Sequence, residues 1–160
     1  KYGFAEVGSP DYPYIGTTYR VTEHWQAGQM TRSLSWLGEA MPEMFVELSK
    51  SLADELGISK GDVVEVSSLR GKVQGVAVVT PRLQPINVGD GNGGTRDVHV
   101  VGMVWHFGFT GMFPGGRERG EQGKVAKRSY AANQLTPHVG DANTTIPEYK
   151  AFLVNVRKVS

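Results

Sequence analysis

The chain has no cysteine, which excludes disulfide bonds, thiolate metal ligands and a cysteine nucleophile from its 160 residues. No run approaches the ~20 apolar residues of a membrane-spanning helix, so direct membrane insertion is not expected. The chain also has no strong excess of positive or negative charge, because 17 basic and 16 acidic residues leave a formal net charge of +1. Without a strong overall field, nucleic acid is not expected as a partner.

Glycine, by contrast, is abundant, with 21 residues or about 13% of the chain against a usual ~7%. This excess indicates many turns and close backbone approaches, as in a loop-rich β protein that packs against a large ligand. A length of 160 residues fits a single domain covering 1–160. Because the chain starts at Lys1 with no signal-like apolar region, we expect a fragment of a longer polypeptide.

The run from Leu56 to Val66 is the most informative for the fold. Gly57 suits the position just after a helix, where a left-handed backbone favours glycine. Gly61-Asp62 supplies a turn in which the Asp side chain can accept hydrogen bonds from nearby backbone N–H groups. A β-branched strand then follows. This unit of helix, Gly-Asp turn and strand resembles the GD box of double-psi β-barrels.

The remaining pattern predicts mainly β structure with a few short helices. Ser49 is a good N-cap for a helix over residues 50–56. We expect a loop with a short helical piece at 23–38 and a flexible loop at 90–97. Strands are predicted at residues 15–22, 44–48, 62–67, 72–80, 83–88, 98–103 and 151–156.

Two segments could hold phosphate. Residues 18–32 join a strand to a polar loop with Arg20, Thr31 and Arg32, and guanidinium forks with hydroxyl groups suit an anion. A surface loop with ordinary salt bridges is the alternative. Residues 90–94 (DGNGG) are rich in glycine. They lack a Walker Lys-Ser/Thr and a following helix, so a plain mobile loop is the expectation.

Two further segments carry rings and amides. His106, between Trp105 and Phe107, could stack on a flat heterocycle or be a satisfied core histidine. Residues 132–137 and 139–144 are dense in Asn, Asp and Thr, and side-chain amides can read the edges of a pterin or guanine. Asx-turns that stabilise a long loop are the alternative.

Metal and hydrolase chemistry are not supported by spacing. The four histidines, at positions 24, 99, 106 and 138, show no HxH or HExxH pattern, and no GxSxG elbow is present. Gly8-Ser9 could suggest a self-cleaving pyruvoyl decarboxylase, but Pro10 follows at once. Residues 115–128 hold five basic and two acidic side chains, typical of a solvated loop that could meet an anionic ligand or a partner subunit.

Four ordered blocks cover nearly the whole chain: IGTTYRVTEHWQ at 15–26, MFVELSKSLADELGISKGDVVEVSSLRGKVQGVAVVTPRLQPINV at 44–88, VHVVGMVWHFGF at 98–109, and ANQLTPHVGDANTTIPEYKAFLVNV at 132–156. Together they resemble the C-terminal molybdopterin-dinucleotide-binding domain of formate dehydrogenase catalytic (alpha or major) subunits, in the dimethyl sulfoxide reductase superfamily. The GDANT…PEYKAFLV ending and the TTYRVTEH block favour the respiratory, membrane-complex type over nitrate or sulfoxide reductases.

The resemblance implies a double-psi β-barrel (aspartate-decarboxylase-like) that closes over a bis-molybdopterin guanine dinucleotide cofactor with Mo or W. The complete enzyme would oxidise formate to CO2 and pass electrons to iron–sulfur clusters. Its Cys or selenocysteine metal ligand would lie in other domains, so this domain would hold no catalytic residue. Implied partners are the remaining domains of the catalytic subunit and an iron–sulfur electron-transfer subunit. The implied location is the periplasm, with the cytoplasm as the alternative.

Twelve positions match the family's cofactor-facing loops. The residues that the resemblance predicts to bind the cofactor are Thr18, Arg20, His24, Gln26, Thr31, Arg32, Trp105, His106, Phe107, Asn133, Tyr149 and Lys150. Gln26 stands where many relatives have a second histidine, although an amide can still donate a hydrogen bond. A non-enzymatic double-psi-barrel adaptor of the kind found on AAA ATPases is the competing interpretation. It would have no need for the blocks around Trp105, Asn133 and residues 147–150.

Overall fold

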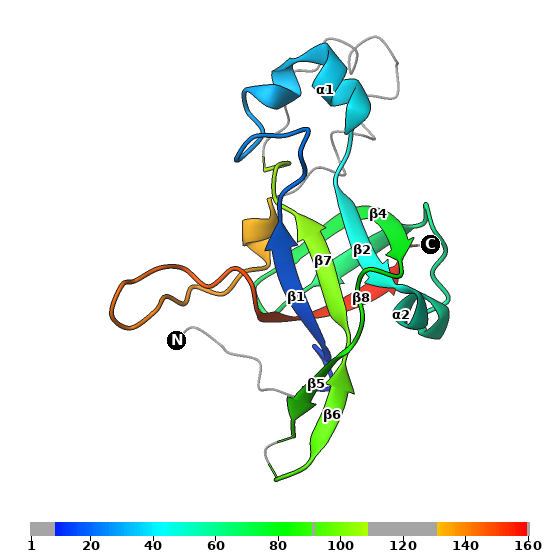
Figure 1. The fold of residues 1–160 in the computed structure, drawn as a ribbon, viewed down its shortest axis with the longest axis vertical. Coiled ribbons are helices and arrows are strands. Elements are labelled where there is room, and N and C mark those ends of the chain that lie inside the picture. Colours follow the sequence, from blue (N-terminus) through cyan, green and yellow to red (C-terminus); the bar gives the residue numbers. More distant parts are fainter. Residues whose placement is uncertain (1–8, 91, 109–130, 160) are drawn as a thin grey trace.

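A computed structural model of the chain describes residues 9–90, 92–108 and 131–159 (Figure 1). Gly8, Phe109 and the basic segment 115–128 lie outside the described residues. The strands are β1 (Tyr14–Tyr19), β2 (Phe45–Ser49), β3 (Val63–Ser67), β4 (Lys72–Thr80), β5 (Ile86–Gly89), β6 (Thr95–Val98), β7 (Val100–Val104) and β8 (Phe152–Lys158). The helices are η1 (Thr31–Ser33), α1 (Ser35–Ala40), α2 (Lys50–Glu55) and η2 (Ala132–Gln134), of which η1 and η2 are 3₁₀ turns.

Six strands close into a barrel in the order β1-β7-β2-β4-β3-β8 (Figure 1). β1 pairs with β7 and β2 with β4 in parallel, whereas the other four barrel pairings are antiparallel. Fully buried side chains such as Val46, Val64 and Met103 fill the interior. The predicted fold, mainly β with a double-psi barrel and a few short helices, is confirmed.

The Gly-Asp unit has the predicted geometry. Gly57 follows α2 with a φ of 62°, and Gly61 has a φ of 91°. The Gly61 N–H donates to the Ala77 carbonyl at 2.9 Å, while the Asp62 carboxylate accepts from the Ser59 N–H at 2.7 Å. The turn therefore links the end of α2 to β4 and delivers the chain into β3.

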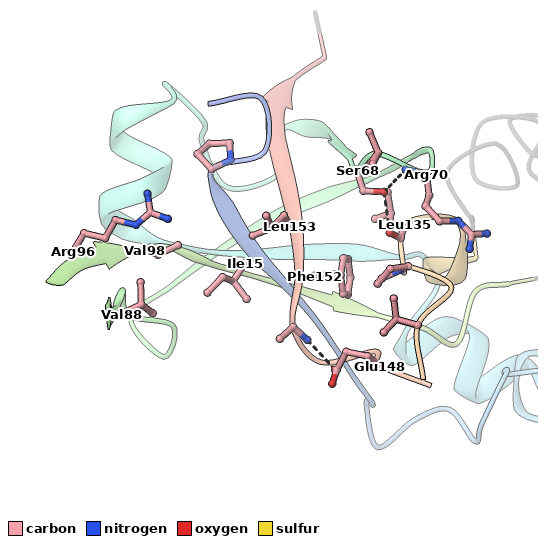
Figure 2. Close-up of a pocket in the computed structure, with 15 residues that line it drawn as sticks. Ile15, Ser68, Arg70, Val88, Arg96, Val98, Leu135, Glu148, Phe152 and Leu153 are labelled. Carbon is pink, nitrogen blue, oxygen red and sulfur yellow. Dashed lines mark hydrogen bonds between the residues drawn. The ribbon is translucent and has the colours of Figure 1, made fainter. Parts of the chain in front are cut away.

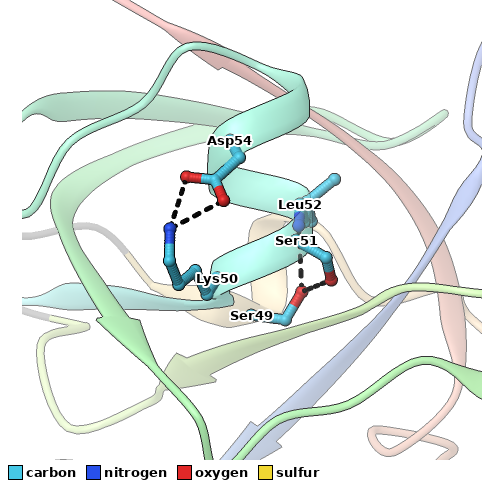
Figure 3. Close-up of polar contacts among 5 residues, drawn as sticks. All are labelled: Ser49, Lys50, Ser51, Leu52 and Asp54. Atoms are coloured by element: carbon cyan, nitrogen blue, oxygen red, sulfur yellow. Dashed lines mark hydrogen bonds and ion pairs between the residues drawn. The ribbon is translucent and has the colours of Figure 1, made fainter.

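Helix α2 begins at its predicted cap (Figure 3). The Ser49 hydroxyl accepts from the Leu52 N–H at 3.1 Å, a contact of the kind that stabilises a helix by about 1 kcal/mol. Leu52 and Ala53 are buried against the barrel, while the Lys50–Asp54 ion pair stays on the exposed face. Within the described ranges, no helix is long and apolar enough to cross a membrane.

Residues 90–97 differ from the expected mobile loop. β5 and β6 form an antiparallel hairpin in which Asn87 lies opposite Asp97, and the Asn87 side-chain amide donates to the Asp97 carboxylate at 2.9 Å. Asp90 Oδ1 accepts the backbone N–H groups of Asn92 and Gly94 at 2.8 and 2.9 Å. The carboxylate thus occupies N–H groups that a phosphate would need, and the described residues Asp90, Asn92, Gly93 and Gly94 belong to the turn of a hairpin.

Candidate functional site

The candidate site lies at the barrel end where β1 and β7 finish (Figure 1). The parallel register pairs Tyr19 with Val104, so the next residues, Arg20 and Trp105, leave the barrel side by side. The Arg20 guanidinium lies 4.7 Å from the centroid of the Trp105 ring, in cation–π contact. Within the described part of the chain, the exposed Arg20 side chain forms no ion pair or hydrogen bond. Its N–H donors are therefore available to a ligand.

A second cation lies next to Arg20. Lys150 Nζ donates to the Thr18 carbonyl oxygen and lies 3.4 Å from Thr18 Oγ1. The Thr18 hydroxyl in turn donates to the Tyr149 carbonyl at 3.0 Å, which fastens the segment before β8 to the end of β1. Burial and then the positive charge of Arg20 lower the pKa of Lys150. Two like charges held together in this way favour an anionic ligand between them.

The His106 ring is fully buried, and both of its nitrogens are used by one loop. The Val21 N–H donates to His106 Nε2 at 3.0 Å, so this nitrogen is unprotonated. His106 Nδ1 carries the proton and donates to the Gln26 carbonyl oxygen. Burial is the main cause that lowers the pKa of His106, which keeps the ring neutral. In this arrangement His106 positions the loop at residues 21–26.

His24 closes the neck of a projecting segment, residues 24–41, which we call the lobe. Its Nε2 donates to the Met41 carbonyl at 2.8 Å, and its Nδ1 lies 3.2 Å from the Thr31 hydroxyl. The Thr31 hydroxyl oxygen also accepts from the Trp25 N–H at 3.0 Å. The His24 ring packs edge-on against Phe107 with 5.4 Å between centroids. His24 therefore ties both ends of the lobe to the core.

The inner face of the lobe buries a glycine and an arginine. Arg32 is only 2% exposed, and its guanidinium lies 4.7 Å from the centroid of the Phe107 ring. Burial lowers the pKa of Arg32 to about 10, so the guanidinium stays charged at neutral pH. Gly28 has a φ of 83°, and a Cβ placed there would overlap the His106 carbonyl oxygen and lie 2.8 Å from Arg32 Cδ. Only glycine fits this contact.

The remaining predicted residues lie around the same barrel end. Asn133 is exposed on η2, and this turn is attached beside the site because Ala131 faces Gly108. Gln26 is exposed with a φ of 46°, and Tyr149 is partly exposed. The structure thus brings Arg20, Trp105 and Lys150 directly together, and it attaches the Asn133 turn next to them. It buries Phe107, His106 and Arg32 behind this surface.

The polar stretch after Pro137 forms hydrogen bonds within its own loop instead of presenting its side chains to a ring. Asp141 Oδ1 accepts from the N–H groups of Asn143 and Thr144 at 3.0 and 2.8 Å. An isolated β-bridge between Gly140 and Pro147 closes the loop. The Asx-turn alternative therefore describes residues 139–144.

Sequence reasoning missed three contributors. Gly28 and the Val21 N–H act through the backbone, and a single glycine among 21 carries no distinguishing signal. The third is a network around the buried Glu47 carboxylate, which accepts from Tyr19 OH and from the mostly exposed Arg82 guanidinium, with Arg82 distances of 2.9 and 2.6 Å. Glu47 could have indicated this network, because it is an acidic residue inside the apolar run of β2 and such a residue is buried only when it is paired.

A cleft of about 480 Å³ opens on the flank of the barrel rather than at its end (Figure 2). Its walls are mostly apolar side chains, including Ile15, Val98 and Leu153, with Arg70 and Arg96 among the charged ones. None of the twelve predicted cofactor-binding residues lines it. An apolar cleft of this kind does not suit a diphosphate, so we do not place the nucleotide there.

A Ser-His-Glu arrangement in the described ranges does not have the exposure that a nucleophile needs. Ser49 Oγ lies 3.3 Å from His99 Nδ1, and His99 Nε2 lies 3.5 Å from Glu55. Ser49 is only 1% exposed and caps α2, so it cannot serve as a nucleophile. Among the residues described, no group of three or more His, Asp or Glu side chains could hold a metal ion.

We expect the stability of the protein to decrease as the pH falls through about 6.5. The folded pKa of His106 is lowered, so the unfolded chain binds this proton more readily. The free energy of unfolding is therefore highest above the unfolded value of ~6.5 and declines as the pH approaches the lower folded pKa. Protonated Nε2 could no longer accept from Val21.

Urea unfolding midpoints measured from pH 8 to pH 5 would check this expectation. His106→Asn removes the titrating group and should flatten the pH dependence. His138→Asn, at an exposed histidine, is the control for the histidine-to-asparagine substitution itself. Equal slopes for the wild type and His106→Asn would contradict the assignment.

Comparison with known families identifies the domain. The profile of the family described as "Molydopterin dinucleotide binding domain" matches residues 14–153. The formate dehydrogenase subunit alpha of Megalodesulfovibrio gigas is 48% identical over 152 residues, covering 95% of this chain and 13% of that protein. The nitrate-inducible formate dehydrogenase major subunit of Escherichia coli K12 is 49% identical over 147 residues, covering 92% of this chain and 12% of that protein.

A solved structure agrees on the fold. Acetylene hydratase from Pelobacter acetylenicus matches with a TM-score of 0.62 and 15% sequence identity, over 92% of this chain and 18% of that one. At this identity the likeness concerns the fold alone. The chain spans about an eighth of the length of the formate dehydrogenase subunits that it matches.

Proposed function

We propose, since this chain belongs to the molybdopterin dinucleotide-binding domain family, that it grips the dinucleotide portion of the cofactor in a formate dehydrogenase catalytic subunit. The observation that carries this proposal is the pair of cations at the barrel end. Within the described residues, neither Arg20 nor Lys150 forms an ion pair. Cationic donors that are not ion-paired with a protein carboxylate suit the diphosphate of a dinucleotide.

The chemistry of the surrounding residues fits such a group. Arg20 and Lys150 would hold phosphate oxygens, each through charge-assisted hydrogen bonds that contribute about 1.5–3 kcal/mol. The exposed amides of Gln26 and Asn133 would donate to and accept from the edges of the guanine or pterin rings. His106, held between two backbone groups, would keep the loop at 21–26 in place.

The longer protein would be a molybdenum or tungsten formate dehydrogenase. Its bound bis-molybdopterin guanine dinucleotide supplies the redox-active metal centre for oxidising formate to CO2, with electrons passing to iron–sulfur clusters. The remaining domains of the catalytic subunit and an iron–sulfur subunit would be its partners, and the periplasm its location. The names of the relatives, formate dehydrogenase alpha and major subunits, support the enzyme class.

Loss of cofactor from charge variants tests the proposal. In the full-length enzyme, Arg20→Ala or Lys150→Ala removes one charge-assisted contact of about 1.5–3 kcal/mol, which corresponds to about 10- to 150-fold weaker retention. The measurement is the molybdopterin content per protein after gel filtration, before any activity assay. Arg70→Ala and Lys60→Ala, at exposed cations outside the site, are the matched controls. Full cofactor content in both site variants would disprove the role of this barrel end.

A further inference from the structure

The lobe exposes large apolar side chains and buries its arginine, which is the reverse of the usual arrangement in a soluble protein. Four of the eight large hydrophobic side chains that are exposed in the described part of the chain fall within residues 25–36. These are Trp25, Met30, Leu34 and Trp36, with exposed fractions of 58%, 66%, 55% and 83%. The same segment buries Gly28 and Arg32. A segment that buries an arginine and exposes two tryptophans presents an apolar surface that marks an interaction site.

The lobe that carries this apolar surface adjoins the candidate site. The lobe stands off the barrel at the end where β1 and β7 finish (Figure 1). Its inner face provides the Gln26 carbonyl that His106 holds, and its neck is closed by the hydrogen bond from His24 to Met41. Whatever covers the outer face therefore lies next to the surface that carries Arg20 and Lys150.

We infer that the outer face of the lobe packs against another domain of the same longer polypeptide, beside the bound cofactor. This inference rests on the proposed function. The formate dehydrogenase subunits similar to this chain are about eight times its length, so most of such a polypeptide lies outside the structure. A covalently attached domain is present at high effective concentration.

The composition of the face fits a permanent apolar contact. Tryptophan and methionine are enriched at the cores of protein interfaces, where charged residues are depleted. The exposed residues between 25 and 36 include no charged side chain, since the only charged residue there, Arg32, is buried. A neutral, aromatic surface of this kind selects an equally apolar partner surface rather than a charged one.

Photo-cross-linking from position 36 in the full-length, cofactor-loaded protein tests the inference. Trp36→p-benzoylphenylalanine keeps a large aromatic group at the most exposed of the four large apolar side chains. We expect a cross-link within one polypeptide, mapped by peptide mass spectrometry to residues outside this domain. A link to a second copy, a link to a separate subunit or the absence of any link would overturn the inference.

A charge variant gives a second measurement. Trp36→Glu should lower the fraction of protein that retains cofactor at least fivefold, while Ile86→Glu, at an exposed residue on the β5–β6 hairpin, should not. Equal retention in the two variants would count against the inference. The two proposals fail separately, because the cross-link at position 36 does not depend on whether Arg20→Ala keeps its cofactor.

Discussion

Gly28→Ala is expected to lower the free energy of unfolding by about 3 kcal/mol and to deplete the bound cofactor. A left-handed backbone costs a residue with a Cβ about 1–2 kcal/mol, and Gly28 has a φ of 83°. The added methyl group would also overlap the His106 carbonyl oxygen. A backbone atom cannot rotate away, so overpacking adds about 1–3 kcal/mol or displaces the loop. Chemical denaturation gives the first quantity and cofactor content the second.

Gly57→Ala is the matched control for this variant. Gly57 also has a positive φ, of 62°, but no described atom lies within 4 Å of the position of its Cβ. This control should therefore cost only the backbone strain of about 1–2 kcal/mol and leave the cofactor in place. If the two alanine variants were equally stable, the close contact between Gly28 and His106 would not exist in solution.

The fold could be predicted from the sequence where its signals are local. The Ser49 cap and the turn at Gly61-Asp62 depend on neighbours a few residues away, and both have the predicted geometry. The order of strands in the barrel could not be predicted in this way. β7 lies between β1 and β2, and the pairing of Tyr19 with Val104 joins residues 85 apart in the sequence. The pairing of β5 with β6 was not predicted, because the sequence pattern indicated a loop at 90–97 where β6 begins.

The candidate site shows the same division. Residue types indicated a possible anion site around Arg20 and amides that could read the edges of a ring, and the family resemblance added Trp105 and Lys150. The structure brings Arg20, Trp105 and Lys150 together. The sequence could not show which of the predicted residues are exposed to a ligand and which are buried beneath the site. His106 and Phe107 are both fully buried, and this depends on how the lobe folds back over them.

Phe107→Ala is expected to lower the free energy of unfolding by about 4 kcal/mol. Phe107 is fully buried in the hydrophobic core, and replacing such a ring by alanine costs about 3–5 kcal/mol through lost burial and the cavity left behind. The same ring contacts His24 edge-on and lies under the Arg32 guanidinium. Its removal would leave the buried charge of Arg32 without its aromatic surface. Urea denaturation of the purified protein measures the change.

Phe107→Leu and Phe45→Ala separate the volume of the ring from its aromatic face. Leucine keeps most of the apolar volume, so a loss of only about 1–2 kcal/mol is expected, yet the lobe loses its cation–π contact. Phe45 is only half-buried, so its alanine variant should cost less than Phe107→Ala. If Phe107→Ala cost no more than Phe45→Ala, Phe107 could not connect the lobe to the barrel. If Phe107→Leu lost cofactor while staying folded, the aromatic face itself would be what holds Arg32 and the lobe beside the nucleotide.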